Sequence, residues 1–94
     1  MAYVITHYFK DGTEDQYQAV VGVAHPGGKL PAGQQYHVAG PTEGGWLVVA
    51  VWDSKADYET FMTGTLVPAL AATPGAFASP PEERSAHVAN LVTG

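Results

Sequence analysis

The residues best suited to chemistry in this sequence are its four histidines. His7, His37 and His87 each fall within a stretch predicted to be a β-strand, whereas His25 lies at a predicted helix end, where a solvated cation is favoured. An unperturbed imidazole titrates at about pH 6.5, so a histidine in a cavity can move protons at neutral pH. Such a group could abstract a proton from a phenol or an activated C–H bond. The alternative is that each histidine packs in the core and is satisfied by a backbone carbonyl or a neighbouring side chain.

Three strand histidines also raise the question of a metal site, because three imidazoles with an open fourth position can form a catalytic zinc site. The sequence has no compact ligand spacing such as His-x-His and no cysteine to supply a thiolate. Whether the three rings point to one face depends on strand register, which sequence alone does not specify. We therefore expect neither a metal nor another cofactor.

Large aromatic side chains could line an apolar pocket that stacks a planar ligand. The predicted ligand-binding residues are Trp52, Tyr36, Phe61, Tyr8 and Asn90. Asn90 is included because a lone amide among apolar strand residues must find a partner or face a pocket. For Phe61 and for Tyr58, which lie on the inward stripe of a predicted helix, a plain hydrophobic core is the alternative.

The composition excludes several classes of protein. The chain has 94 residues and a net charge of −5, and its four basic residues are scattered, so no basic stripe is present to bind nucleic acid. No apolar run approaches the roughly 18 residues of a membrane-spanning helix. The N-terminus lacks the basic and apolar regions of a signal peptide. We expect one cytoplasmic, soluble domain over residues 1–94 that binds neither nucleic acid nor membrane.

Local patterns predict the element order β-α-β-β-α-β. Strands are predicted from β-branched and aromatic residues bounded by turn residues, over residues 3–9, 35–39, 46–52 and 86–92. One helix is predicted to begin at the Thr13 capping box and end before His25, and another to cover residues 55–72 with a kink near Gly64 and Pro68. This order is that of the ferredoxin-like α+β fold, with an antiparallel sheet in the strand order 4-1-3-2.

The third predicted strand bears on assembly because both of its faces are apolar. One face carries Trp46, Val48, Ala50 and Trp52, and the other carries Leu47, Val49 and Val51. Two helices can cover only one face of a four-stranded sheet, and each large side chain left in water forfeits roughly 1.5–3 kcal/mol of burial energy. The simplest cover is the same face of a second copy, which predicts a homodimer. A monomer with an exposed apolar sheet is the alternative.

The stretch from His37 to Phe61, HVAGPTEGGWLVVAVWDSKADYETF, joins a hairpin ending in Trp-Asp-Ser to a helix with aromatic residues near its start. In this it resembles the dimeric α/β-barrel superfamily, in particular small actinobacterial proteins of the antibiotic-biosynthesis-monooxygenase type. The resemblance implies that two sheets pack face to face as a dimeric α/β barrel, with a pocket in each subunit. The superfamily includes cofactor-free oxygenases of polyketide quinols, haem-degrading enzymes, muconolactone isomerases and stress proteins, so fold does not determine the reaction.

The haem-degrading members use a strand Asn, a helix Trp and a helix His. Here Phe61 stands at the apparent Trp position, the second predicted helix has no His, and the first strand has no Asn, so haem degradation by that route is not expected. The resemblance implies a small-molecule-binding protein that acts as a cofactor-independent monooxygenase or proton-transfer enzyme on an aromatic or polyketide-like substrate. His37, in the hairpin that lines the superfamily pocket, is the main acid–base candidate, with His7 and His87 as alternates. The other function left open is a non-catalytic dimeric binding or stress-response module.

Overall fold

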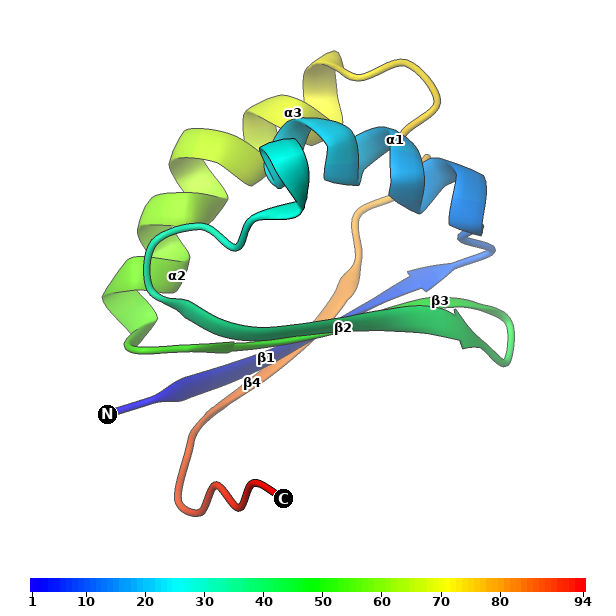
Figure 1. Cartoon of the computed structure of the whole chain (residues 1–94). Coiled ribbons are helices and arrows are strands. Elements are labelled where there is room, and N and C mark those ends of the chain that lie inside the picture. The colour runs from blue at the N-terminus through cyan, green and yellow to red at the C-terminus, as the bar shows by residue number, and fades with distance from the viewer.

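The computed structural model describes residues 1–94, apart from the side chain of Pro26, as one antiparallel sheet with helices packed on one of its faces (Figure 1). The strands are β1 (Tyr3–Lys10), β2 (Gln34–Thr42), β3 (Gly45–Trp52) and β4 (Glu82–His87). The helices are α1 (Glu14–Ala24), α2 (Lys55–Phe61) and α3 (Val67–Ala72). The strand order β2-β3-β1-β4 and the element order confirm the predicted ferredoxin-like α+β fold.

Helix α1 begins at the predicted capping box. The Thr13 hydroxyl accepts a hydrogen bond from the Gln16 backbone N–H (3.2 Å), and the Gln16 side chain accepts one from the Thr13 N–H (3.0 Å). The helix ends at His25, where the chain turns through one 3-10 turn, Pro26–Gly28. Both glycines of this turn have positive φ angles, 70° and 73°, a conformation that glycine adopts without steric cost. The turn therefore ends the helix and directs the chain back toward the sheet.

The second helical segment is interrupted, as the positions of Gly64 and Pro68 predict. Helix α2 is capped by the Ser54 hydroxyl, which accepts a hydrogen bond from the Asp57 backbone N–H (3.2 Å). A π-helical turn, Met62–Leu66, then separates α2 from α3. Pro68 has no N–H to donate to the carbonyl one turn earlier, so the regular α-helical ladder is broken there. No helix in the described part of the chain is long and apolar enough to cross a membrane.

The position of the last strand differs from the prediction. The sequence predicts it over residues 86–92, but β4 covers Glu82–His87 and pairs with β1 from Tyr8 to Tyr3. Every residue of β4 is exposed, so no apolar side-chain pattern marks it in the sequence. Its place is decided by backbone pairing along the free edge of β1, which is a tertiary interaction.

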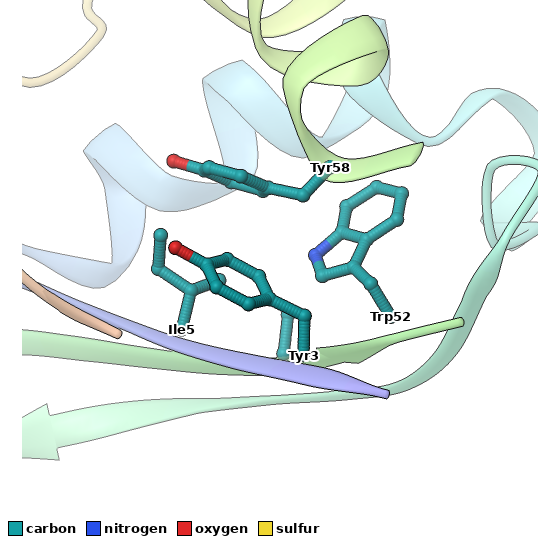
Figure 2. Close-up of a cluster of buried hydrophobic side chains, with 5 residues drawn as sticks. Tyr3, Ile5, Trp52 and Tyr58 are labelled. Atoms are coloured by element: carbon teal, nitrogen blue, oxygen red, sulfur yellow. The ribbon is translucent and has the colours of Figure 1, made fainter. Parts of the chain in front are cut away.

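The two faces of the sheet have different environments. The inner face packs against the helices around a buried cluster of Tyr3, Ile5, Ala50, Trp52 and Tyr58, most of which Figure 2 shows. On the outer face, the half-buried Val49 of β3 lies between Thr6 of β1 and Val38 of β2 in the sheet register. Val38 is 64% exposed, and within the described residues no element covers this face. Strand β3 therefore carries apolar side chains on both faces of the sheet, and the described helices cover only one of these faces.

Candidate functional site

A cavity lies between the inner face of the sheet and the helices. Its polar lining residues are His7, Tyr17, His25, Gln34, His37 and Tyr58, and the rest of its wall is aliphatic or aromatic. Among the described residues, no lysine, arginine, aspartate or glutamate lines it. The cavity volume is about 60 Å³, and the empty space reaches about 570 Å³ when the part open to solvent is included. The site is therefore an uncharged, largely apolar cavity that opens to solvent.

His37 of β2 reaches into the cavity and contacts Tyr17 of α1. The Tyr17 hydroxyl lies 2.6 Å from His37 Nε2, and the two rings are nearly parallel, at 18°. Burial raises the pKa of Tyr17, which keeps its proton available for donation. Burial, together with the charge that His25 would carry, lowers the pKa of His37 to about 4, so this imidazole is uncharged at neutral pH. The Tyr17 hydroxyl and His37 Nε2 thus share one hydrogen bond, while Nδ1 of the same ring is buried without a partner.

His25 extends this cluster at the end of α1. Its ring packs edge-on against the His37 ring, with centroids 4.7 Å apart, and lies 5.8 Å from the Phe61 ring. Burial lowers the pKa of His25, opposed by a hydrogen bond to the Lys29 backbone. The sequence suggests a solvated residue here, but only 9% of His25 is exposed, because the turn after α1 folds it against β2.

Four buried polar atoms of the cavity-lining residues have no hydrogen-bond partner in the described structure. They are His25 Nδ1, His37 Nδ1, Gln34 Oε1 and Trp52 Nε1. Buried polar atoms nearly always have a partner, either in the protein or as bound water, and leaving one unpaired costs about 1–3 kcal/mol. The unpaired polar atoms are therefore concentrated around one cavity.

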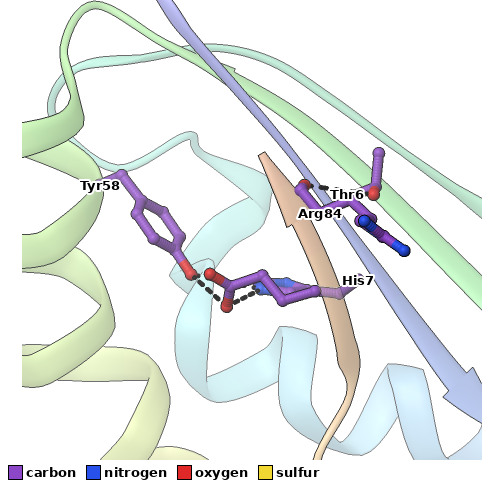
Figure 3. A network of polar contacts seen from close by, with 5 residues as sticks. Thr6, His7, Tyr58 and Arg84 are labelled. Carbon is purple, nitrogen blue, oxygen red and sulfur yellow. Dashed lines mark hydrogen bonds and ion pairs between the residues drawn. The ribbon is translucent and has the colours of Figure 1, made fainter. Parts of the chain in front are cut away.

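A second polar cluster lies toward the opposite edge of the sheet and joins β1, α2 and β4 (Figure 3). His7 Nε2 lies 3.2 Å from both Glu83 Oε2 and the Tyr58 hydroxyl, and that hydroxyl donates to Glu83 Oε2 at 3.1 Å. Burial and the Glu83 carboxylate raise the pKa of Tyr58, so it remains protonated. Burial lowers the pKa of His7, while Glu83 acts in the opposite direction through its charge and hydrogen bond.

The structure places the predicted site residues in two groups. His7, His37, Trp52 and Phe61 line the cavity. The residues outside it are His87, exposed on β4; Tyr36 and Tyr8, on the outer face of the sheet; and Asn90, exposed near the C-terminus. Neighbouring residues of a strand point to opposite faces, so Tyr36 cannot share the cavity with His37, nor Tyr8 with His7. No three acidic or histidine side chains among the described residues are grouped so that they could hold a metal ion.

Tyr17 and Glu83 contact the cavity histidines but are not among the residues predicted from the sequence. Tyr17 lies on the apolar stripe of its helix, and a hydroxyl on such a stripe is a signal that could have identified it. Glu83 lies in the polar run Glu82–Ser85, in which nothing distinguishes one carboxylate from the other. Its role depends on its pairing opposite His7 across β1 and β4, a register that local sequence does not contain.

Lowering the pH is expected to destabilise the fold through His7, His25 and His37. The pKa of each is lowered in the folded protein, so the unfolded chain binds protons first once the pH falls below about 6.5. The free energy of unfolding should therefore be highest above about pH 7 and fall toward about pH 4, where His37 protonates. Urea unfolding followed by circular dichroism at several pH values measures this.

The matched variant for this measurement is His37→Gln, which removes the ionisable ring and keeps a polar side chain. Between about pH 7 and 5, before most carboxylates titrate, its stability should depend less on pH than that of the unaltered protein. Equal pH dependence in the two proteins would contradict the burial of an uncharged His37.

No protein-family model matches the sequence, and no curated protein does. Among solved structures, the chain is similar to a proposed antibiotic biosynthesis monooxygenase from Chloroflexus aurantiacus, with a TM-score of 0.69 and 15% identity over 99% of this chain and 98% of the other. It is also similar to a monooxygenase from Streptomyces coelicolor in complex with nanaomycin D, with a TM-score of 0.60 and 18% identity over 99% and 91%. The resemblance predicted from His37–Phe61 is thus confirmed as a likeness of fold: the chain shares the ferredoxin-like α+β fold of these two solved structures.

Proposed function

We propose that this protein is a homodimer that binds a small aromatic molecule in the cavity and converts it without a cofactor, by removal of a proton followed by reaction with O2. The observation that carries the proposal is the pair of uncharged imidazoles, His25 and His37, whose Nδ1 atoms are buried and unpaired in an otherwise apolar cavity. A purely structural role for these histidines predicts that each ring nitrogen has a hydrogen-bond partner. A ligand oxygen held at this end of the cavity would satisfy them.

The lining favours an uncharged aromatic ligand. Trp52, Phe61 and Phe9 present aromatic rings to the cavity, and such rings pack well against a planar molecule. A charged group would enter a cavity without a lining counter-ion, which is costly because the charge loses its hydration. Because the cavity volume is small, a larger ligand would enter from the part that opens to solvent, and some of the ligand would remain in that part.

The histidines are suited to different steps. In the tautomer with the ring proton on Nδ1, His37 can hold a ligand hydroxyl or carbonyl oxygen and stabilise the negative charge that forms there. With a pKa of about 4, His37 is a weak proton acceptor. His7, whose low pKa from burial is partly offset by Glu83, is better suited to accept the proton. In this proposal His37 binds the ligand, and His7, an alternate to His37 as the acid–base residue expected from the sequence, is the base.

The chemistry can be written for anthrone, a tricyclic ketone with an acidic methylene group. Removal of one C–H proton gives an aromatic, electron-rich anion that O2 can oxidise directly. The overall reaction, anthrone plus O2 to anthraquinone plus water, is balanced and needs no other reductant. The protein would contribute the base, the donor for the oxyanion and a cavity that orients the ring.

The test uses aromatic probes of one, two and three rings, namely catechol, 1-naphthol and anthrone, with binding measured by calorimetry and anthrone turnover by O2 consumption and anthraquinone absorbance. We expect micromolar-range binding of at least one probe, and His37→Ala should weaken that binding about tenfold, as for the loss of one hydrogen bond of about 1.5 kcal/mol. His87→Ala removes a histidine outside the cavity and should bind like the unaltered protein. Binding of none of the probes would contradict the proposal, and binding without turnover would support the non-catalytic binding module instead.

The proposal of a homodimer is based on the outer face of the sheet. This face presents apolar side chains from β3 and β2, namely Leu47, Val49, Val51, Val38 and Tyr36. Val38 is 64% and Tyr36 45% exposed in the single chain, and contiguous exposed apolar surface of this kind usually marks an interface. The same face of a second copy would bury it in a two-fold contact and close two sheets into a barrel. That the protein is cytoplasmic stays a prediction.

A further inference from the structure

We propose that Glu83 is a positioning residue that holds the His7 ring in one tautomer and stabilises the charge that His7 acquires when it accepts a proton. This inference rests on the proposed function in one respect, namely that His7 accepts a proton from the ligand. The contact itself belongs to the free protein and can be tested without a ligand.

The geometry places a half-exposed carboxylate against a buried ring. Glu83 comes from the edge strand β4, and its side chain is 44% exposed, while that of His7 is 7% exposed. The two residues are paired across the β1–β4 register, so their side chains point to the same face of the sheet. Glu83 Oε2 lies 3.2 Å from His7 Nε2 and accepts from the Tyr58 hydroxyl at 3.1 Å, a network whose contacts are dashed in Figure 3. The carboxylate thus contacts the cavity-lining His7 from this edge of the sheet without lining the cavity itself.

The hydrogen bonds determine which nitrogen of His7 carries the proton. Glu83 Oε2 can only accept, and it already accepts from the Tyr58 hydroxyl at 3.1 Å. His7 Nε2, at 3.2 Å from both oxygens, must therefore be the donor, shared between the carboxylate and the Tyr58 oxygen. A neutral imidazole with its proton on Nε2 has its lone pair on Nδ1. Nδ1 is then the basic atom that remains for a ligand in the cavity.

The same contact favours the protonated state that the reaction would produce. When Nδ1 takes a proton, the ring becomes an imidazolium whose Nε2–H faces the Glu83 carboxylate, and this pair is a charge-assisted hydrogen bond. The other groups facing His7 carry no charge: Tyr58 from α2 is a protonated phenol, and Phe9 packs edge-on at 6.3 Å. Farther along α2, Lys55 and Glu59 form their own ion pair at 3.8 Å. Glu83 is accordingly the carboxylate that acts on His7.

The Tyr17–His37 cluster has no equivalent of this carboxylate. His37 is buried, shares a hydrogen bond with a phenol and is adjacent to a second imidazole, an environment that disfavours its protonation. The surroundings of His37 therefore disfavour its protonation, as suits a hydrogen-bond donor, whereas those of His7 include a group that favours protonation, as suits a base. The Glu83 carboxylate is the group that favours protonation of His7.

The ligand-free test compares Glu83→Gln with Glu82→Gln in the purified full-length protein. Glu82 is the neighbour of Glu83 on β4, faces the outer side of the sheet, and its replacement changes the net charge equally. Ring nitrogens are observed by two-dimensional 1H–15N NMR over pH 4–8, with His7→Gln used for assignment. We expect the neutral His7 ring to have its proton on Nε2. The pKa of His7 should fall in Glu83→Gln and remain unchanged in Glu82→Gln.

The kinetic test uses anthrone as the probe. Glu83→Gln should lower kcat about 10- to 100-fold with little change in KM, a range below the full effect of a general base. Its acidic limb in the pH–rate profile should also move to lower pH. Far-UV circular dichroism establishes that both variants fold.

The outcomes separate the two proposals. An unchanged pKa and tautomer of His7 in Glu83→Gln, or an unchanged kcat, overturns the role of Glu83. An unaltered protein that neither binds nor oxidises any probe overturns the proposed function, and the NMR result then decides alone whether Glu83 sets the state of His7.

Discussion

Replacing Trp52 with alanine is expected to reduce the free energy of unfolding by about 3–5 kcal/mol, the largest stability effect of any single substitution in the core. Trp52 is only 1% exposed, and its ring packs 5.9 Å from the Tyr58 ring and 5.2 Å from the Phe61 ring. Figure 2 shows it facing Tyr58 across the buried cluster. Alanine would leave a void between β3 and α2 that the surrounding strands and helices cannot fill by small shifts.

Urea unfolding followed by far-UV circular dichroism measures this effect, at one protein concentration because the stability of a dimer depends on concentration. Leu30→Ala is the control, since Leu30 is 45% exposed in the loop before β2 and its replacement should change the stability by less than about 0.5 kcal/mol. Trp52→Phe should lie between the two. A loss below about 1 kcal/mol for Trp52→Ala would contradict the central place of this ring in the core.

Val49→Asp is expected to convert the proposed dimer into a monomer. Val49 lies in the middle of the outer sheet face, between Thr6 and Val38. A carboxylate there would be buried without a partner on dimerisation, and two-fold symmetry would bring a second carboxylate close to it. Leaving an uncompensated charge buried costs about 3–5 kcal/mol, so the dimer dissociation constant should rise at least about 100-fold.

Native mass spectrometry and light scattering over a dilution series measure the assembly state. The control is Val67→Asp, the same change of charge at a residue of α3 that is 52% exposed and lies on the helical side of the molecule. That variant should remain dimeric. A monomeric unaltered protein, or a Val49→Asp protein that dimerises as tightly as the unaltered one, would show that the outer face is not the interface.

Prediction from the sequence is correct where the signal lies within a few neighbouring residues. Three such signals are local, and each predicts the element found: the capping box at Thr13, the apolar run from Trp46 to Trp52 and the interruption near Pro68. It was wrong for the last strand because β4 has no apolar alternation and is positioned only by the edge of β1. It also missed the burial of His25, because helix-end position alone does not tell which way the following turn folds.

The candidate site is formed by contacts between segments that are distant in the chain, so the tertiary structure determines it. Helices, turns and the apolar faces of single strands depend on interactions between residues close in the chain, so sequence alone was sufficient for the ferredoxin-like order and for an outer face that needs a cover. The cavity depends on register between distant segments: His37 meets Tyr17 across 20 positions, and His7 meets Glu83 across 76. A shift of one residue in the β2–β3 or β1–β4 pairing would turn His37 or Glu83 to the other face of the sheet. Only the folded sheet therefore decides which groups surround His37 and His7 in the cavity.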